Sequence, residues 1–404
     1  MGAGRGDHLR LSLAHGLLQL APTLRHAVVA GSPDDEGNSV EVVRGLAGLM
    51  PVYWLVNEHP ESLLWLVDDV DGRANIRCVP RDSVRAYLAY LTARYIFFTH
   101  GLYGSPPPPA HKTVVNLWHG DGPKSRKGFA IIRSTFIVAG TSMWGLRRSQ
   151  IFDVPAESVL ITGNPRVDQF QRPPTREAMR TLALSDDRPL VLWLPTYRRT
   201  EYRGRRLGAV RNWSDADDLS RSEDPTEFAE QLARAAAERG IQVAIKPHPL
   251  DADRYEALPL PVIGQAELRQ ARTTPYQLLG ITRGLITDYS SVWTDYLSLD
   301  RPIGFFCPDL DAYQAARGLN VEHYEEILPG PLLHSKDTVD AFLDECLEDS
   351  IAARARRRQV ALTIGTGEAA GATDRLLAAL GLTTAPQLSR RPRAGARPAR
   401  SSRG

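Results

Sequence analysis

Residues 224–249 read "DPTEFAEQLARAAAERGIQVAIKPHP", a helical pattern followed directly by a short apolar run. Asp224 is suited to be the N-cap of the helix, Pro225 to be its first residue and Gly240 to be its C-cap. The run from Ile241 to Ile245 then predicts a buried strand. A strand that follows a helix in this way indicates parallel α/β units, in which helices connect the strands of one sheet.

The same alternation of short apolar runs and longer helical patterns extends over most of the chain. "RDSVRAYLAYLTA" (81–93) predicts a helix because Val84, Tyr87, Leu88 and Leu91 recur at helical spacing. No repeat of fixed period is visible, which argues against solenoids and propellers. The segments that predict further strands are "PVYWLV" (51–56), "YIFFTH" (95–100), "TVVNLWHG" (113–120), "STFIVAG" (134–140), "PLVLWLPTYR" (189–198), "LITDYSS" (285–291) and "PIGFF" (302–306).

Two domains are the expected organisation of a chain of 404 residues. Pro173 and Pro174 mark the boundary between them. Each half has the pattern of an open, mostly parallel sheet wrapped by helices, and ligands bind such sheets at the carboxyl ends of the strands. We therefore expect an α/β protein whose two Rossmann-like domains face a cleft. The polar, arginine-rich stretch between Arg198 and Ser220 is interpreted as a long loop near that cleft.

The overall composition is that of a globular protein, with 43% hydrophobic and 24% charged residues. A net charge of +2 gives little reason to expect nucleic acid as a partner. Cys78, Cys307 and Cys346 lie far apart and form no CxxC pair, which favours the reducing cytoplasm over a disulfide framework or a zinc site. No window approaches the roughly 20 apolar residues that a transmembrane helix needs.

Two terminal segments differ from the body of the chain. Residues 389–404 carry six arginines and no acidic residue, and we interpret 381–404 as a disordered basic tail. The segment from Leu9 to Leu20 is rich in leucine but lacks the cleavage site of a signal peptide. Both segments would suit peripheral binding to the anionic inner face of the cell membrane, and a solvated tail is the alternative.

Four predicted strands run from apolar residues straight into polar ones that suit a phosphate group. They are followed by "WHGDGPK" (118–124), "PTYR" (195–198), "KPHP" (246–249) and "TDYSS" (287–291). In the last of these, Ser290 and Ser291 precede a predicted helix, so that hydroxyls and free backbone N–H groups would face one point and form an anion site. A simple N-cap is the structural alternative.

The other three strand ends add charged and proton-accepting groups. In "KPHP" the two prolines fix the backbone, so that Lys246 would supply a charge and His248 a hydrogen bond to a phosphate. In "WHGDGPK", His119 is a candidate proton acceptor, and Gly120 with Gly122 would let a ligand approach the backbone closely. "PTYR" adds Thr196 and Arg198. Taken singly, each of these residues has a structural alternative as a capped or solvated strand end.

Other catalytic signatures are missing from the sequence. HExxH and paired cysteines are absent, and the acidic cluster "DADD" (215–218) is better interpreted as part of a loop. GxSxG and GxGxxG are also absent, which weakens the case for a hydrolase or for a dinucleotide-binding enzyme. We therefore expect neither a metal nor an organic cofactor.

The order of the motifs resembles that of the CDP-glycerol:glycerophosphotransferases, the enzymes that build poly(glycerol phosphate) and related teichoic acids. Motifs similar to W-H-G, G-x-P-R-x-D, P-T-x-R, K-x-H-P and I-T-D-Y-S-S occur in the same order, at 118–120, 163–168, 195–198, 246–249 and 286–291. A further similar segment contains Asp309, Leu310, Tyr313, Arg317 and Gly318, followed by Glu325, Glu326 and "PGP" (329–331). The resemblance runs from about Gly31 to about Leu343.

The resemblance implies a GT-B-like fold, with an acceptor-side domain at 1–172 and a nucleotide-donor domain at 173–380. It implies transfer of a glycerol-phosphate or other polyol-phosphate unit from CDP-glycerol, or a related CDP-polyol, to a hydroxyl of a membrane-linked acceptor, lipid or polymer, with release of CMP. Such a transfer needs positioning and charge neutralisation at the phosphates. His119 is the candidate general base and His248 its rival. The implied donor-binding residues are Gly120, Thr196, Arg198, Lys246, Asp288, Ser290, Ser291 and Arg317.

One departure from the family pattern leaves the acceptor open. Where most members have Thr-Pro after His-Gly, this chain has Asp121, Gly122 and Pro123. A carboxylate at Asp121 would orient His119 or meet an acceptor hydroxyl, and we assign Asp121 and Lys124 to the acceptor side. Glycerol and ribitol remain alternatives for the transferred polyol. A nucleotide-sugar glycosyltransferase or epimerase of the same architecture, and a non-catalytic CDP-alcohol-binding protein, remain alternative functions.

Overall fold

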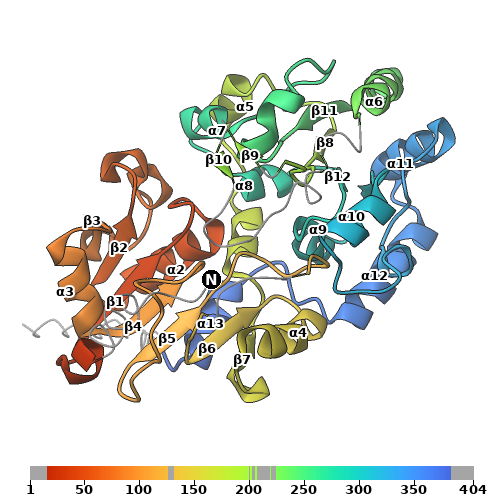
Figure 1. Cartoon of the computed structure of the whole chain (residues 1–404). Helices are drawn as coiled ribbons and strands as arrows, with labels where there is room; N and C mark the ends of the chain where they lie inside the picture. Colours follow the sequence, from red (N-terminus) through yellow and green to blue (C-terminus); the bar gives the residue numbers. More distant parts are fainter. Residues whose placement is uncertain are drawn as a thin grey trace, which may run out of the picture.

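The structure is a computed structural model that describes residues 16–125, 132–199, 219 and 224–383, together with the backbone of 201–202 and 205–206. The predicted basic tail beyond residue 383, the acidic cluster at 215–218 and the predicted apolar segment before residue 16 lie outside the described residues. Two parallel β-sheets, each covered by helices, form the body of the molecule (Figure 1). The predicted α/β class with two Rossmann-like halves is therefore confirmed.

The first sheet contains seven parallel strands in the order β3-β2-β1-β4-β5-β6-β7. The strand order reverses between β1 and β4, which is the point where open α/β sheets bind ligands. The strands are β1 (Leu24–Ala30), β2 (Val52–Val56), β3 (Ile76–Pro80), β4 (Ala93–Phe98), β5 (Thr113–Asn116), β6 (Phe136–Ala139) and β7 (Val159–Ile161). The helices between them are α2 (Gly37–Ala47), α3 (Val84–Thr92) and α4 (Ser142–Phe152).

The second sheet is smaller, with four parallel strands in the order β11-β8-β12-β13. Its order reverses between β8 and β12, which gives a second switch point. The strands are β8 (Leu190–Trp193), β11 (Gln242–Ile245), β12 (Gly284–Thr287) and β13 (Ile303–Phe305). The helices are α5 (Arg176–Thr181), α6 (Thr226–Glu238), α7 (Gln265–Gln270), α8 (Pro275–Leu279), α9 (Val292–Tyr296), α10 (Leu310–Ala316), α11 (Lys336–Glu348), α12 (Ile351–Ile364) and α13 (Ala372–Ala379).

The helix–strand unit at 224–249 forms as predicted, with small shifts at its ends. α6 begins at Thr226, and Pro225 rather than Asp224 occupies the N-cap position. The Asp224 carboxylate still accepts a hydrogen bond from the Thr226 N–H, at 3.0 Å. At the other end Arg239 is the C-cap, and Gly240 follows it in the left-handed region at φ +66°. The helix thus ends one position earlier than expected, and Gly240 occupies the position after the C-cap.

The predicted helix at 81–93 is also present as α3, and only part of its apolar spacing is buried. Val84 and Leu88 are 77% and 56% exposed. Ala86, Ala89 and Tyr90 are the residues of α3 that pack into the core. Tyr87 and Leu91 are partly buried against the same core, so the apolar spacing predicted the helix correctly, and two of its four apolar positions face solvent.

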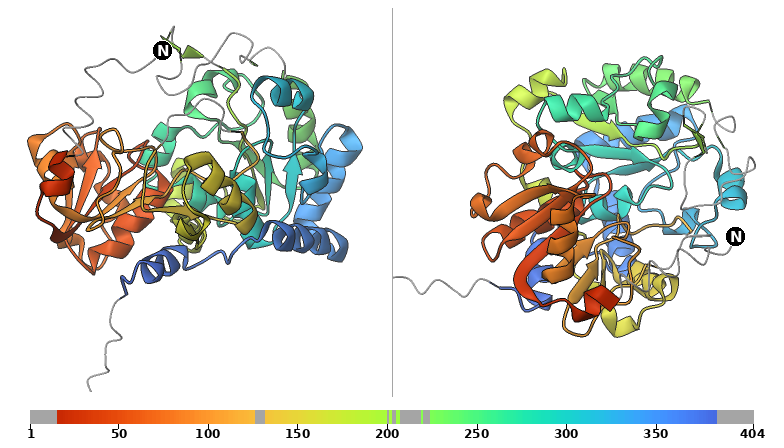
Figure 2. Two further views of the ribbon diagram at one scale, coloured as in Figure 1. Left: turned by 60° about the horizontal axis from the view of Figure 1, so that its bottom comes forward. Right: turned by 60° about the vertical axis from the view of Figure 1, so that its left-hand side comes forward.

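The last helix of the described chain packs against the first sheet, although it follows the second sheet in sequence (Figure 2). Leu376 and Leu377 of α13 lie in one core cluster with Val40 and Val43 of α2. Asp168 fixes the start of α13 by accepting hydrogen bonds from the backbone of its first two residues. The division of the chain at residue 172/173 stays a prediction, since α13 crosses it.

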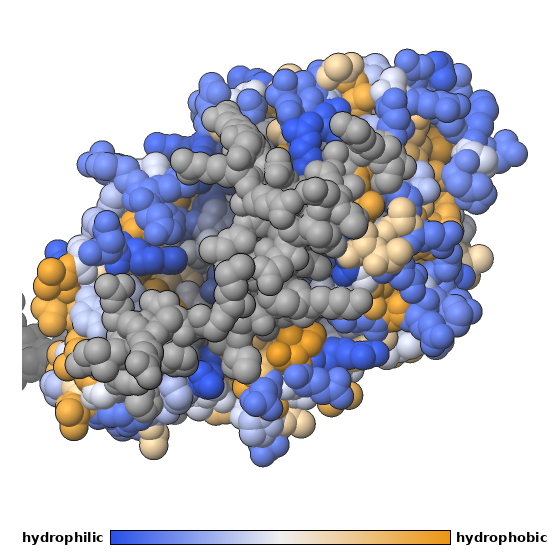
Figure 3. All heavy atoms as spheres, viewed as in Figure 1, coloured by the Kyte–Doolittle hydropathy of each residue, from blue (hydrophilic) through white to orange (hydrophobic). Residues whose placement is uncertain are grey.

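Within the predicted loop 198–220, the described backbone includes a short antiparallel pair of strands, β9 (Glu201–Tyr202) and β10 (Arg205–Arg206). On the face shown in Figure 3, hydrophilic side chains cover most of the described surface, and apolar ones form small separate groups. Among the described residues, no helix combines the length and the apolar character needed to span a bilayer.

Candidate active site

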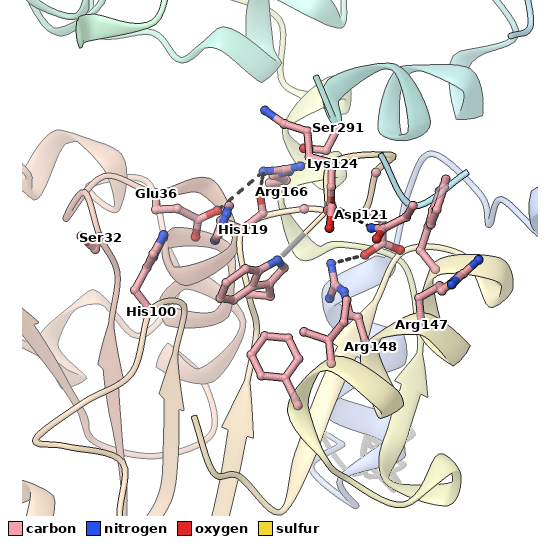
Figure 4. Close-up of a pocket in the computed structure, with 18 of the residues that line it drawn as sticks. Ser32, Glu36, His100, His119, Asp121, Lys124, Arg147, Arg148, Arg166 and Ser291 are labelled. Atoms are coloured by element: carbon pink, nitrogen blue, oxygen red, sulfur yellow. Dashed lines mark hydrogen bonds and ion pairs between the residues drawn. The ribbon is translucent and has the colours of Figure 1, made fainter. Parts of the chain in front are cut away.

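A cavity of about 520 Å³ lies where the carboxyl ends of strands from both sheets meet (Figure 4). From the first sheet, the segments after β1, β4, β5 and β7 contribute Glu36, His100, His119 and Arg166. From the second sheet, the segments after β8, β11 and β12 contribute Tyr197, His248 and Ser291. The cavity therefore contains both predicted histidines, and it is built by both halves of the chain.

His119 stands at the end of the segment that follows β5. Its ring stacks on the ring of His100, with centroids 4.3 Å apart and planes 7° apart. Its Nδ1 atom is buried and has no hydrogen-bond partner among the described residues. Desolvation, followed by the nearby positive charge of His100 and Arg166, holds the pKa of His119 well below its usual value. His119 is therefore a neutral imidazole at pH 7, which can accept a proton.

Gly120 and Gly122 serve packing within the protein. Gly120 has a φ of +124°, and a Cβ atom there would overlap the Arg166 guanidinium and the Ser291 hydroxyl. A Cβ atom on Gly122 would overlap the backbone of Ser291. Both glycines line the cavity, so their predicted close approach to a ligand stays a prediction, and their present neighbours belong to the other loops of the site.

A buried carboxylate of the second half anchors the loops of the first. Asp295 of α9 accepts hydrogen bonds from Arg166 Nε and Nη2, at 2.8 and 2.6 Å, and from Asn164 Nδ2, at 2.7 Å. Tyr276 donates a further hydrogen bond to it. Arg166 in turn donates to the backbone carbonyl of His119, at 2.8 Å. This chain of contacts fixes His119 relative to the second sheet.

His248 has a hydrogen-bond pattern that determines where its proton lies. Its Nδ1 accepts a hydrogen bond from the Leu250 N–H, at 3.2 Å, so in the neutral ring the proton is on Nε2. Burial, together with the charges of Lys124 and Lys246, lowers the pKa of His248 to about 3. The neutral ring can therefore donate a hydrogen bond through Nε2, while its acceptor atom, Nδ1, is already occupied by the Leu250 N–H.

The predicted acceptor-side segment after Gly120 is bound to the second half by backbone contacts. Lys124 forms an antiparallel bridge with Leu319, and the Asn320 side chain donates to the Lys124 carbonyl at 2.8 Å. Ser125 N donates to the carbonyl of Gly318, at 3.0 Å. Lys124 lines the cavity, and its charge acts on His248 across it.

Asp121 is neutralised away from His119, which corrects the prediction that it orients the histidine or meets an acceptor hydroxyl. Its carboxylate pairs with Arg148 of α4 and accepts the N–H groups of Gly140 and Thr141, at 2.6 and 2.8 Å. Only 1% of Asp121 is exposed. Although the residue borders the cavity, its carboxylate contacts tie the loop after β5 to the junction of β6 and α4.

Four predicted donor-binding residues form a buried cluster behind the cavity. Arg198 is 1% exposed and pairs with Asp288 and Asp309, at 2.8 Å each. The Thr196 N–H donates to Asp288, and Arg317 donates to the backbone carbonyl of Tyr197, at 2.9 Å. These contacts join the ends of β8 and β12 and so hold Tyr197 at the cavity wall.

Lys246 and Ser290 lie beside the cavity rather than in its lining. Burial lowers the pKa of Lys246 to about 8, with Asp35 partly opposing the shift. Ser290 N donates to Asp288, at 3.2 Å. Ser291 is the N-cap residue of α9, and its side chain makes no capping hydrogen bond. Ser291 is therefore the serine of the pair that faces the cavity.

Sequence reasoning gave no role to three residues that line the cavity, Glu36, His100 and Arg166. Arg166 belongs to the G-x-P-R-x-D motif at 163–168, and Glu36 lies in the loop after Gly31, where the family resemblance begins. His100 ends the predicted strand "YIFFTH", the same strand-end position that singled out His119. Within the described residues, no cluster of three or more His, Cys, Asp or Glu is arranged to hold a metal ion.

Known proteins with similar sequences act in teichoic acid synthesis. The chain is 25% identical over 237 residues to the teichoic acid glycerol-phosphate primase of Bacillus spizizenii, which covers 54% of this chain and 56% of the primase. It is 25% identical over 357 residues to the teichoic acid glycerol-phosphate transferase of Staphylococcus aureus, covering 79% and 86%. The chain thus spans little more than half the length of the primase.

A solved structure from teichoic acid synthesis has a similar fold. The wall teichoic acid polymerase TagF superposes with a TM-score of 0.66 at 18% identity, over 94% of this chain and 98% of that one. The predicted GT-B-like architecture is confirmed. The family model for CDP-glycerol:poly(glycerophosphate) glycerophosphotransferases matches residues 40–380. With most of its length matched, and with the family's motifs gathered around one cavity, the chain belongs to the CDP-glycerol:poly(glycerophosphate) glycerophosphotransferase family.

Proposed function

We propose that the protein transfers a glycerol-phosphate unit from CDP-glycerol to a hydroxyl of a membrane-linked acceptor and releases CMP. The observation that carries the proposal is the meeting of two neutral histidines with different hydrogen-bonding roles, His119 from the first half and His248 from the second, in one cavity. Family membership and the names of the relatives support CDP-glycerol as the donor.

In this proposal His119 is the general base toward the acceptor hydroxyl. A neutral imidazole with a free acceptor atom can take the hydroxyl proton as the oxygen attacks the β-phosphorus of CDP-glycerol. His248 donates a hydrogen bond through Nε2 to a phosphate oxygen, and Lys124 adds positive charge on the same side. Stabilising the charge of the transferred and leaving phosphates in this way lowers the barrier.

We assign the nucleotide to the second half and the acceptor to the first. Ser291 lines the cavity at a strand end of the second sheet and Lys246 lies beside it, so that a diphosphate would meet a hydroxyl with an ammonium group close by. Arg198, Asp288, Thr196 and Arg317 then support the donor site from behind, since their buried contacts position its loops.

CMP release from CDP-glycerol tests the proposal directly. His119→Asn should lower kcat by about 100-fold or more, the usual contribution of a general base. His323→Asn, which changes an exposed histidine outside the cavity lining, is the matched control and should transfer normally. If His119→Asn keeps full transfer while His248→Asn abolishes it, the assignment of the base is wrong.

The same assay separates the alternative functions. Turnover of a UDP-sugar panel without turnover of CDP-glycerol would indicate a glycosyltransferase or an epimerase. Tight CDP-glycerol binding without CMP release, in the presence of lipid-linked acceptors, would indicate a binding protein.

We also propose that the protein works at the inner face of the cell membrane. Leu17 and Leu20, at the start of the described chain, are 47% and 86% exposed. The arginine-rich sequence after residue 389 would add about 1 kcal/mol of membrane binding per basic residue near an anionic surface. Deletion of 390–404 should weaken binding to anionic liposomes, and unchanged binding would remove this part of the proposal.

A further inference from the structure

Glu36 lies in the cavity but belongs to no motif that the proposed reaction uses. It precedes α2 at the β1 switch point, and its side chain is only 8% exposed. One carboxylate oxygen, Oε2, accepts the Ser39 N–H at 3.0 Å and so caps the helix. The other oxygen, Oε1, is buried without a hydrogen-bond partner among the described residues. The Arg166 guanidinium forms a long ion pair with Oε1, at 3.9 Å.

A second buried polar atom without a described partner borders the same cavity. This atom is Nδ1 of His119. In Figure 4 the side chains of Glu36 and His119 lie on the same side of the cavity, next to Arg166. Buried polar atoms that lack partners are costly, so two of them in one cavity indicate a bound molecule that brings hydrogen-bonding groups.

The donor groups that fit these two atoms are hydroxyls. A carboxylate only accepts hydrogen bonds and repels phosphate oxygens, so Oε1 is unsuited to the diphosphate. A bound molecule could hydrogen-bond His119 with one hydroxyl and Glu36 with a second, neighbouring hydroxyl. Because His119 is the proposed base, this molecule is the acceptor.

We propose that Glu36 is a specificity-determining residue that accepts a hydrogen bond from a second hydroxyl of the acceptor, adjacent to the hydroxyl that attacks. The site thereby selects acceptors that end in a vicinal diol, as a glycerol unit or a sugar does. This inference rests on the proposed function, because it places the attacking hydroxyl at His119.

The charges around Glu36 define the conditions of the test. Burial raises the pKa of Glu36 to about 7, while the Arg166 charge opposes the shift and Asp295 adds to it. Above that pH the ionised, acceptor-only form prevails, so the assay is set at about pH 8.

The experiment compares two soluble acceptors, octyl glycerol phosphate and its analogue without the secondary hydroxyl. For the unaltered protein, kcat/KM with the diol should exceed that with the deoxy analogue by roughly 10- to 100-fold, the value of a hydrogen bond to a charged group. Glu36→Gln keeps an oxygen to cap α2 but can present an amide donor to the cavity. It should lower kcat/KM for the diol to the level of the deoxy analogue and leave the KM for CDP-glycerol unchanged.

Glu41→Gln is the matched control, since Glu41 is equally buried on the same helix but pairs with Arg172 outside the cavity. It should keep the preference for the diol. Equal rates with both acceptors in the unaltered protein, or an equal loss with both in Glu36→Gln, would overturn the inference while leaving the proposed function intact.

Binding of the two acceptors, measured by ligand-observed NMR, provides a readout that does not need turnover. If CDP-glycerol is not turned over, the proposed function fails. Loss of the binding preference in Glu36→Gln would still support the diol site, and no preference in the unaltered protein would refute it.

Discussion

His119 and His248 are both neutral, but their environments give them different chemistry. The pKa of both rings is lowered first by desolvation, and nearby cations add to the shift. Nδ1 of His119 has no described partner, whereas Nδ1 of His248 is occupied by the Leu250 N–H. The sequence left open which histidine takes the proton, and the hydrogen bond to Leu250 favours His119.

His248 should make the fold sensitive to acid. In the unfolded chain a histidine takes up a proton below its usual pKa of about 6.5. The folded form stays neutral down to about pH 3. The unfolded state therefore binds more protons between these values, and stability falls as the pH falls. Between pH 7.5 and pH 5 the unaltered protein should lose about 2 kcal/mol relative to His248→Asn.

Urea unfolding of the two proteins at pH 5, 6 and 7.5 measures this difference. His323→Asn serves as the exposed-histidine control. A stability difference between His248→Asn and the unaltered protein that does not change with pH would contradict the buried, neutral state of His248.

At the scale of elements, Asp121 connects the loop after β5 to α4 of the first half and to α9 of the second half. Its carboxylate meets Arg148 and the N–H groups at the start of α4, while its backbone carbonyl accepts a hydrogen bond from Thr294 of α9, at 3.0 Å. The carboxylate that departs from the family pattern thus fixes the loop that carries His119, and does so through α4.

Asp121→Ala should destabilise the protein by about 3–5 kcal/mol, because it leaves the buried Arg148 without its carboxylate partner. Arg148→Met should also lower the free energy of unfolding, since it leaves the buried Asp121 carboxylate without its cation. The double variant Asp121→Asn/Arg148→Met removes both charges. Its loss in free energy of unfolding should be smaller than the sum of the losses in Asp121→Asn and in Arg148→Met. Additive losses in urea unfolding would show that the ion pair does not link the β5 loop to α4.

The sequence predicted those elements and site residues whose signal is local. The end of a strand is recognisable in the sequence where an apolar run turns polar, and this signal predicted His119, His248 and Ser291. The structure places all three in the lining of one cavity. Arg198 has the same local signal, but its side chain is held by an ion pair with Asp309, 111 positions away, which the local pattern does not show. Glu36 looks like any acidic loop residue until Arg166 and the cavity surround it.

At the scale of the whole molecule, α13 makes the first sheet depend on the far end of the chain. The helix contacts α2 and the segment Pro165–Gln171, and Leu376 is fully buried among the residues of the first core. Gly45 of α2 has no side chain, and this lets Thr373 and Leu377 pack directly on that helix. The first half therefore contains a helix from the end of the chain, after the whole second sheet, and the two halves also meet at the cavity.

Leu376→Ala should lower the free energy of unfolding by about 2–5 kcal/mol, the usual cost of removing a buried leucine side chain. Because the helix packs on the first sheet, hydrogen exchange should accelerate in α2 and β1, which lie more than 300 positions earlier, and less in β8 and β12. Leu362→Ala is the matched control on α12, since Leu362 is 78% exposed and should cost no more than about 0.5 kcal/mol. Faster exchange confined to the second sheet would show that α13 belongs to that half, and it would place the domain boundary where the prolines at 173 and 174 predicted it.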